Sequence, residues 1–332
     1  MTEGERQSAV PDDGHSPAPK IDVSVAHPAR VYDYWLGGKN NYAADREAAE
    51  ATLKVNPYIL PGVRANRAFL ASAVRYLAQE AGIRQFLDIG TGLPTENSTH
   101  EVAQSVAPES RVVYVDNDPI VLAHARAMLT GTPGTTAYID ADLRDPGKVL
   151  SEAAGTLDFG EPVAVMLLMI LMHIPDEADP HGIVTRLVSA VPSGSYLVIS
   201  ETVDEVDASV IAESRQEYNE RVGPSQWSPR TKAGFTRYFD GLEIIEPGLV
   251  TMGLWRPAPG APVPDRPIPA YCGVAKKPLR RSPRIFCFRE PARAGVDGDQ
   301  GQAEPGSRLR VRRAGGRTLK GQLTAASSIP AK

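Results

Sequence analysis

Residues 86–95 read FLDIGTGLPT, and the interpretation of the whole chain starts from them. Apolar residues lead into Asp88, and Gly90 and Gly92 follow at alternate positions. Glycine lets the backbone adopt positive φ angles and lets a ligand approach it closely. In a doubly wound parallel sheet, such a sequence forms the first strand and the turn after it, where ligands bind. We therefore expect a binding site at the end of this strand.

Two further acidic residues follow the next predicted strands. Asp116 closes the apolar run VVYVD, at the position from which an acid reaches a ribose diol. Asp142 follows the third strand within DADLRD, although Asp140 or Asp145 could take its role. Asp145 also precedes a proline and therefore suits the N-cap of a helix. Asp88 has a structural alternative as well, which is to cap the turn that follows it.

Beyond this stretch the chain alternates between short apolar runs and amphipathic segments. Apolar residues at helical spacing predict a helix over 66–81, ended by Gly82, and Asp118 followed by Pro119 predicts a helix start. The predicted strands are 85–89, 111–115, 137–140, 162–169, 196–200, 242–245 and 270–275, and other helices are expected at 29–36, from about 97, over 204–221 and up to 239. This alternation predicts a doubly wound α/β sheet.

The glycine spacing bears on which ligand binds. A dinucleotide-binding turn uses the pattern G-x-G-x-x-G to hold a pyrophosphate. Thr95 stands where the third glycine would be, and Pro94 precedes it. This departure disfavours a nucleotide-dependent oxidoreductase, which is one rival interpretation, and suits a ligand without a pyrophosphate.

Taken in order, Asp88, Gly90, Gly92, Asp116 and Asp142 resemble the cofactor motifs of class I S-adenosylmethionine-dependent methyltransferases. The resemblance implies that S-adenosylmethionine is the cofactor. It implies that Asp88, Gly90 and Gly92 surround the methionine half, that Asp116 binds the ribose hydroxyls and that Asp142 contacts the adenine amine. It also implies the fold of that class, a doubly wound, mostly parallel, seven-stranded Rossmann-like α/β sheet, here with an N-terminal helical extension.

A second set of motifs is similar to one group within that class. PARVYDYWLGGKNNYAADR at 28–46, ANRAFL at 65–70, MHIPD at 172–176 and FDGL with EPG between 239 and 248 match an actinobacterial group. That group was formerly domain of unknown function 574 and is now named as S-adenosyl methyltransferases. The resemblance covers about 28–277 and names no methyl acceptor.

His173 is the candidate catalytic residue. It follows the fourth predicted strand, at the edge of the sheet where substrate meets cofactor in this fold. Its imidazole titrates near neutrality and could accept a proton from the acceptor. The alternative is a hydrogen-bonded residue that shapes the loop.

The N-terminal block is richer in aromatic and polar residues than a simple cap on the sheet would need. We therefore expect residues 23–82 to include a helical lid over cofactor or substrate. The candidate lid or substrate residues are Tyr32, Tyr34, Asn40, Asn41 and Arg67. A plain structural cap is the alternative.

Composition bounds the remaining classes. The chain has 332 residues, with 36 Lys and Arg against 40 Asp and Glu, so it is not basic overall. We expect a methyltransferase domain over 23–277, a disordered N-terminus over 1–22, and a basic disordered tail over 278–332 that buries too little apolar surface to fold. The tail lacks the interleaved aromatic residues of nucleic-acid binders, which disfavours a nucleic-acid partner.

No apolar run is long enough to span a bilayer, no apolar leader opens the chain, and the two cysteines and six histidines show no metal-ligand spacing. These features predict a cytoplasmic protein without a membrane or metal partner. They do not indicate an oligomeric state.

The sequence thus predicts an S-adenosylmethionine-dependent methyltransferase with a small-molecule acceptor. The rival from another class is a non-catalytic S-adenosylmethionine-binding or regulatory protein with the same fold. No N/D-P-P-Y motif follows the fourth strand, which argues against methylation of amino groups on DNA bases.

Overall fold

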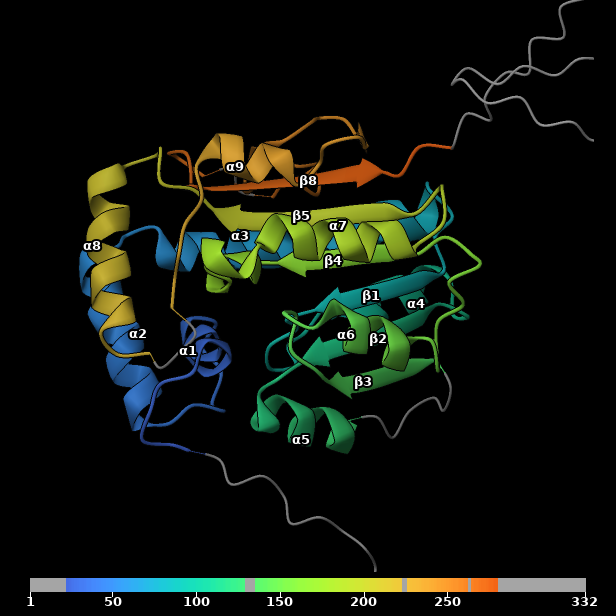
Figure 1. Cartoon of the computed structure of the whole chain (residues 1–332). Coiled ribbons are helices and arrows are strands. Elements are labelled where there is room, and N and C mark those ends of the chain that lie inside the picture. Colours follow the sequence, from blue (N-terminus) through green and yellow to red (C-terminus); the bar gives the residue numbers. More distant parts are fainter. Residues whose placement is uncertain (1–21, 129–134, 223–225, 262–263, 280–332) are drawn as a thin grey trace, which may run out of the picture. The chain divides into compact units, whose positions relative to one another are not determined.

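The core of the protein is one mixed sheet of eight strands, seen in a computed structural model (Figure 1). The structure describes residues 22–128, 135–222, 226–261 and 264–279. Residues 1–21 of the expected disordered N-terminus, and residues 280–332 of the expected tail, lie outside the described residues.

Five parallel strands form the main part of the sheet. They are β1 (Gln85–Ile89), β2 (Arg111–Asp116), β3 (Thr136–Asp140), β4 (Ala164–Leu168) and β5 (Tyr196–Thr202). The strand order is β3-β2-β1-β4-β5-β8-β6, so the chain turns back at β1 and the doubly wound topology is confirmed. Every residue of β1, β4 and β5 is buried, which explains why these strands are nearly continuous apolar runs.

The last strands run against the others. β8 (Ala270–Lys276) pairs antiparallel with β5, and β6 (Glu243–Ile244) and β7 (Val250–Thr251) pair antiparallel with β8. The expectation of seven strands was one too few, because β7 was missed. A strand of two residues is too short to show the alternation of apolar and polar side chains that reveals a strand in a sequence.

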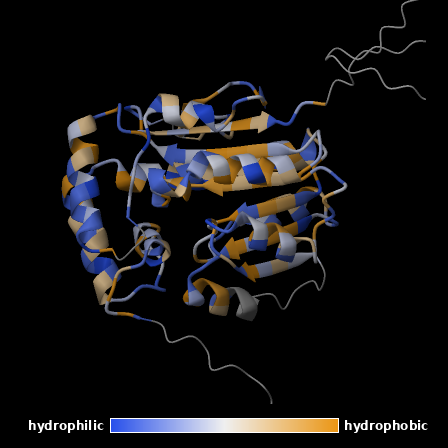
Figure 2. Cartoon of the chain, in the orientation of Figure 1, coloured by the Kyte–Doolittle hydropathy of each residue, from blue (hydrophilic) through white to orange (hydrophobic). Residues whose placement is uncertain are grey.

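Helices cover both faces of the sheet. On one face α3 (Ile59–Gln79) and α4 (Thr99–Val106) pack over a core that includes Leu77 and Phe86. On the other face, α6 (Pro146–Ala153), α7 (Pro180–Ala190) and α9 (Lys232–Arg237) enclose a second core. Figure 2 shows the apolar residues concentrated in the strands between these two layers.

Three helices, α5, α6 and α7, begin at a repeated pair, Asp-Pro. Asp118 accepts a hydrogen bond from the Ile120 amide at 2.9 Å at the start of α5 (Pro119–Met128), as predicted. Asp145 caps α6 and Asp179 caps α7 in the same way. Proline suits the first helical position because its missing N–H would have no helical partner there.

Two predicted helices have different limits in the structure. α3 starts at Ile59 rather than at residue 66, because Pro61 falls in its first turn, where a missing N–H does no harm. It ends before Gly82, as predicted. The helix expected over 204–221 is α8 (Ala208–Asn219), which Asp207 precedes in a left-handed conformation.

A layer of helices lies beyond the carboxyl ends of β1 to β5 (Figure 1). It consists of α1 (Pro28–Trp35), α2 (Ala43–Val55) and α8, where α1 and α8 both contact α2. The short 3-10 helices η1 (Leu171–His173) and η2 (Asp176–Ala178) follow β4. This layer therefore closes the edge of the sheet at which the sequence predicts the binding site.

Candidate functional site

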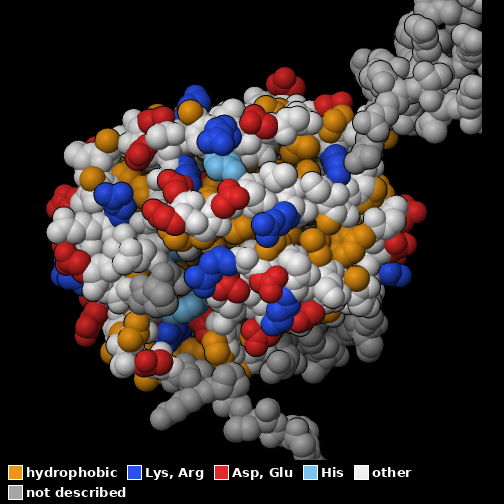
Figure 3. All heavy atoms as spheres, viewed as in Figure 1, with side chains coloured by type: hydrophobic (Ala, Val, Ile, Leu, Met, Phe, Trp, Pro, Cys, Tyr) orange, Lys and Arg blue, Asp and Glu red, His pale blue; other side chains and the backbone are white. Residues whose placement is uncertain are grey.

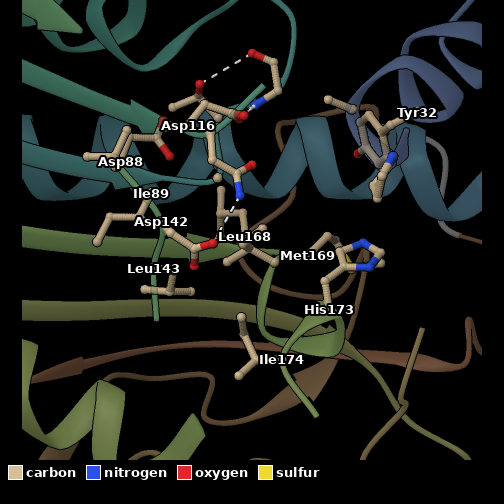
Figure 4. A pocket seen from close by; sticks show the side chains of 18 of the residues that line it. Tyr32, Asp88, Ile89, Asp116, Asp142, Leu143, Leu168, Met169, His173 and Ile174 are labelled. Atoms are coloured by element: carbon tan, nitrogen blue, oxygen red, sulfur yellow. Dashed lines mark hydrogen bonds between the residues drawn. The ribbon is translucent and has the colours of Figure 1, made fainter. Parts of the chain in front are cut away.

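A cleft opens at the carboxyl ends of β1, β2 and β4, where the sequence predicts it (Figure 4). We call it the polar cleft. It encloses about 1120 Å³ of space between its lining atoms, part of it open to solvent. The lining comprises His27, Pro28, Ala29, Tyr32, Asn66, Arg67, Leu70, His173 and Ile174, together with residues 88–92, 115–117, 141–144 and 168–170.

The turn after β1 brings bare backbone to this cleft. Gly90 and Gly92 have φ angles of +75° and +63°, which other residues rarely adopt. The Gly90 amide donates a hydrogen bond to the Val115 carbonyl at 2.8 Å, which ties the turn to β2. A Cβ on Gly90 would come within 3.0 Å of the Ile170 side chain, whereas one on Gly92 would meet nothing within 4 Å. The two glycines are therefore required for different reasons.

Asp116 organises the floor of the polar cleft. Its Oδ2 accepts a hydrogen bond from the Gly92 amide and its Oδ1 accepts one from the Asp118 amide, both at 2.9 Å. Burial raises the pKa of Asp116, and these two amide donors oppose that shift. Each carboxylate oxygen can accept a second hydrogen bond. Asp116 can therefore hold the glycine turn and still bind a ligand hydroxyl.

Asp88 lies beside Asp116 at the end of β1 and is almost fully buried. It accepts a hydrogen bond from the Thr99 hydroxyl at 2.6 Å. Burial raises its pKa to about 6, against the lowering effects of that hydroxyl and of the Arg67 guanidinium. Asp88 has a structural partner in α4, yet it also lines the cleft.

Asp142 is the acid of its segment that lines the cleft. Its pKa is lowered chiefly by Arg144, whose guanidinium donates to Oδ1 at 2.9 Å and to Oδ2 at 2.5 Å. Asn117 donates to Oδ2 at 3.2 Å. Asp145 instead caps α6, and Asp140 is not part of the lining. The alternatives that the sequence left open are thus separated by position.

His173 ends η1 and lines the polar cleft on the side opposite Asp88 and Asp116 (Figure 4). Its ring centroid lies 6.2 Å from that of Tyr218. The loop that carries it is held from outside the cleft, since the Ser228 amide donates to the Met172 carbonyl at 2.7 Å. The Arg230 guanidinium also donates to the Ile174 carbonyl.

The expected lid residues divide into two groups. Tyr32 and Arg67 line the polar cleft. Tyr34 instead donates to Glu50, while Asn40 and Asn41 donate to Asp33. Tyr34 points elsewhere because residues two apart on a helix face in different directions. Of the five expected residues, Tyr34, Asn40 and Asn41 therefore lie outside the lining and hold the segment between α1 and α2.

A second cavity adjoins the polar cleft, and no motif in the sequence predicts it. We call it the apolar chamber. It encloses about 650 Å³, part of it open to solvent, and shares Pro28, Tyr32, Met169 and His173 with the polar cleft. Its other lining residues are Trp35, Asn56, Tyr58, Ile59, Gly62, Val63, Met172, Thr202, Ile211, Tyr218, Trp227, Met252, Ile268, Pro269 and Ala270. These come from segments far apart in the chain, so no local motif marks them.

The fold and the cleft define a class I methyltransferase, with acids after β1, β2 and β3 and a glycine turn between them. The chain belongs to the family of S-adenosyl methyltransferases, because the sequence model of that family matches its residues 14–278. It is therefore an S-adenosylmethionine-dependent methyltransferase, as its resemblance to that family implied.

Two solved structures are similar over most of the chain. A DUF574 family protein from Streptomyces avermitilis is 47% identical, with a TM-score of 0.74, and covers 78% of this chain and 100% of its own. A protein from Thermobifida fusca, provisionally named a methyltransferase, is 40% identical, with a TM-score of 0.73, and covers 79% of this chain and 99% of its own. No protein with a curated description matches the chain.

No helix in the described part of the chain is long and apolar enough to cross a membrane. Within the same residues, no group of three or more His, Cys, Asp and Glu side chains is arranged to hold a metal ion.

Proposed function

We propose that the protein transfers the methyl group of S-adenosylmethionine to a small molecule held beside the polar cleft. The observation that carries this proposal is that the two cavities are adjacent and share Pro28, Tyr32, Met169 and His173 in their linings. A cofactor in one cavity and an acceptor in the other would then face each other at that junction. On the face seen in Figure 3, basic and acidic side chains are interspersed, which favours a small acceptor over a nucleic acid.

The lining of the polar cleft suits each part of the cofactor. Asp116 has free acceptor capacity for the ribose hydroxyls, and Asp142 would accept from the adenine amine in exchange for one of its present donors, Arg144 or Asn117. Asp88, Gly90 and Gly92 would surround the methionine half, where positive φ angles and missing side chains leave room for a ligand. Nothing in this turn provides the third glycine that a pyrophosphate needs.

The chemistry needs little from the protein beyond alignment. When bound, the cofactor supplies an electrophilic methyl group. A bond forms between the methyl carbon and the acceptor atom as the carbon–sulfur bond breaks, and positioning contributes much of the rate. Where the acceptor atom carries a proton, the His173 imidazole would receive it.

The first experiment separates an enzyme from a binding protein. We expect calorimetry to detect binding of S-adenosylmethionine and not of NAD. We also expect S-adenosylhomocysteine to accumulate when the purified protein is supplied with S-adenosylmethionine and fractions of a metabolite extract. Tight binding without turnover on any fraction would favour the non-catalytic alternative.

The role of His173 has its own test. We expect His173→Gln to slow methyl transfer about 100-fold, because a positioned base contributes that much or more. The affinity for S-adenosylmethionine should stay within about twofold, and the pH-rate profile should lose the limb that reports the imidazole. His181→Gln is the matched control, since His181 stacks on Tyr238 and lines neither cavity. A purely structural role would lower the melting temperature and leave the shape of the profile unchanged.

We also propose that residues 23–277 form the complete methyltransferase domain and that it works in the cytoplasm. α1 and α2 belong to this domain because α1 contributes Pro28, Tyr32 and Trp35 to the cavities. The buried free thiol of Cys272 fits a reducing compartment.

A further inference from the structure

The apolar chamber carries no charged side chain. None of the residues that line it is Asp, Glu, Lys or Arg. The polar cleft beside it is lined by Arg67, Asp88, Asp116, Asp142 and Arg144. A charged group that entered the chamber would lose its hydration without gaining a partner, which is strongly unfavourable. The chamber therefore selects against charged acceptors.

Aromatic rings form a continuous wall in this chamber. The ring centroid of Tyr218 lies 6.2 Å from Trp35, 6.0 Å from Trp227 and 6.2 Å from His173. Stacked and edge-on contacts between rings stabilise a bound ring beyond the burial of its area. The wall leads from the chamber to His173, and so toward the junction with the polar cleft. A flat ring lying along it would extend from the chamber toward His173, which lines both cavities.

Several polar atoms of the walls are already used within the protein. The Tyr58 hydroxyl donates to Asp207 at 2.8 Å, and the Trp35 indole donates to the Ala49 carbonyl at 3.2 Å. The Tyr32 hydroxyl accepts from the Asn66 amide at 3.0 Å. What these walls offer a ligand is therefore mainly apolar and aromatic contact.

Methionines complete the lining. Met169, Met172 and Met252 present unbranched, polarisable side chains, which adapt to the outline of a ligand and contact aromatic rings favourably.

We propose that the apolar chamber binds the methyl acceptor and that this acceptor is an uncharged, ring-containing small molecule. This inference rests on the proposed function and deepens it by naming the substrate class. Aromatic faces can also attract a cation, so a cationic ring compound is the competing ligand that the experiment has to separate from a neutral one.

Gly62 offers a way to fill the chamber without touching the polar cleft. It lies inside α3 and does not have a positive φ angle. It lines the apolar chamber but not the polar cleft. A Cβ built there would meet only Ile268, at an ordinary 3.7 Å. Gly62→Phe should therefore place a ring in the chamber, and Gly62→Ala should fold at least as well as the natural chain, because alanine favours helices.

The test is calorimetry on the full chain saturated with S-adenosylhomocysteine. The probes are three ring compounds of similar size, namely neutral 2-naphthol, anionic 2-naphthoate and cationic 2-naphthylmethylammonium. We expect 2-naphthol to bind at least tenfold more tightly than either charged probe. Gly62→Phe should weaken 2-naphthol at least tenfold, Gly62→Ala by less than threefold, and S-adenosylhomocysteine should bind all three proteins within twofold.

The outcomes separate this inference from the proposed function. Failure to bind S-adenosylhomocysteine would refute the proposed function. If S-adenosylhomocysteine binds normally, three results would each overturn the inference and leave the proposed function intact. These results are that 2-naphthol does not bind below 1 mM, that a charged probe binds as tightly as 2-naphthol, or that Gly62→Phe does not weaken the binding of 2-naphthol.

Discussion

The polar cleft and the apolar chamber share four residues, yet their walls have opposite character. The polar cleft is built from short turns at the ends of strands, where backbone amides such as those of Gly92 and Asp118 hold carboxylates in place. The apolar chamber lies largely between helices, whose backbone groups are already paired, so mostly apolar and aromatic side chains face it. Strand ends can therefore keep buried acids for a polar ligand, while packed helices favour a neutral one.

Removal of α1 and the start of α2 should have the largest effect on both cavities. Deletion of residues 1–46 removes Pro28, Tyr32 and Trp35, which line one or both cavities. It also leaves buried Asp118 without His27 and Arg30, which lie 2.9 and 3.7 Å from it. Loss of the partners of a buried charge is strongly destabilising. We expect no folded protein, or no measurable binding of S-adenosylmethionine by calorimetry.

Deletion of residues 1–22 is the control, and it should leave the affinity for S-adenosylmethionine unchanged. If the protein without residues 1–46 folds and binds as tightly, α1 is neither a lid nor a wall of the site.

The glycine turn gives the next largest effect. Gly90→Ala forces a Cβ against Ile170 and strains a positive φ angle. We expect the free energy of unfolding to fall by about 2–4 kcal/mol. Gly92→Ala strains φ without a clash and should lose about 1 kcal/mol. Urea denaturation of the two variants checks this, and equal losses would show that contact with Ile170 is not the reason for Gly90.

Glu201 is a buried acid that, unlike Asp116, lacks hydrogen-bond donors within the described part of the chain. This carboxyl group is fully buried at the end of β5, and neither of its oxygens has a hydrogen-bond partner among the described residues. Burial raises its pKa to about 8, although nearby Arg230 lowers it and Asp176 raises it further. Because the folded state holds this proton more tightly than the unfolded state, its contribution to stability is present below about pH 4.5 and is lost as pH rises through 8.

We therefore expect the free energy of unfolding to fall between pH 5 and pH 9 by a larger amount in the natural chain than in Glu201→Gln. The difference between the two losses should be about 2–4 kcal/mol. Glu205→Gln, at an exposed position nearby, is the control and should follow the natural chain. Parallel stability curves for all three proteins would mean that Glu201 ionises normally.

Asp116 and Asp142 are compared within the polar cleft. Asp116→Ala should weaken S-adenosylmethionine by about 5–150-fold, because a buried hydroxyl contact to a charged acceptor contributes about 1–3 kcal/mol. Asp142→Ala should have a smaller effect, because Asp142 is more exposed and already paired with Arg144. Calorimetry with Asp240→Ala as an exposed control measures both. An unchanged affinity in Asp116→Ala would contradict the assignment of the ribose contact.

The sequence predicted the fold well because its signals are local. Most residues of the parallel strands β1, β2, β4 and β5 are buried, and the acids and glycines of the polar cleft lie at the ends of strands or within a few residues of them. Asp88 and Asp116 could therefore be predicted from their positions after two strands, whereas Asp142 was one of three candidates in its segment. The Asp-Pro pairs likewise marked helix starts by backbone chemistry that does not depend on distant contacts.

The apolar chamber could not be predicted in this way. Trp35 and Tyr58 are far along the chain from Tyr218 and Trp227, and only tertiary packing brings the two pairs together. The lid residues show the same limit at short range. Tyr32 and Tyr34 are the same residue type on one helix, and only the orientation of α1 about its axis decides which of them lines the cavities.

The position of β8 has a consequence for how the protein behaves outside its folded state. β8 pairs with β5 over all seven of its residues, from Ala270 with Thr202 to Lys276 with Tyr196. A chain shortened before β8 would leave β5 as an exposed edge with unpaired backbone groups and apolar side chains, which promotes aggregation. Lys277 adds to this junction, since its ammonium donates to the Val188 and Val191 carbonyls. Shortened forms that retain Lys277 should therefore stay dispersed in solution, whereas those that end before β8 should self-associate through β5.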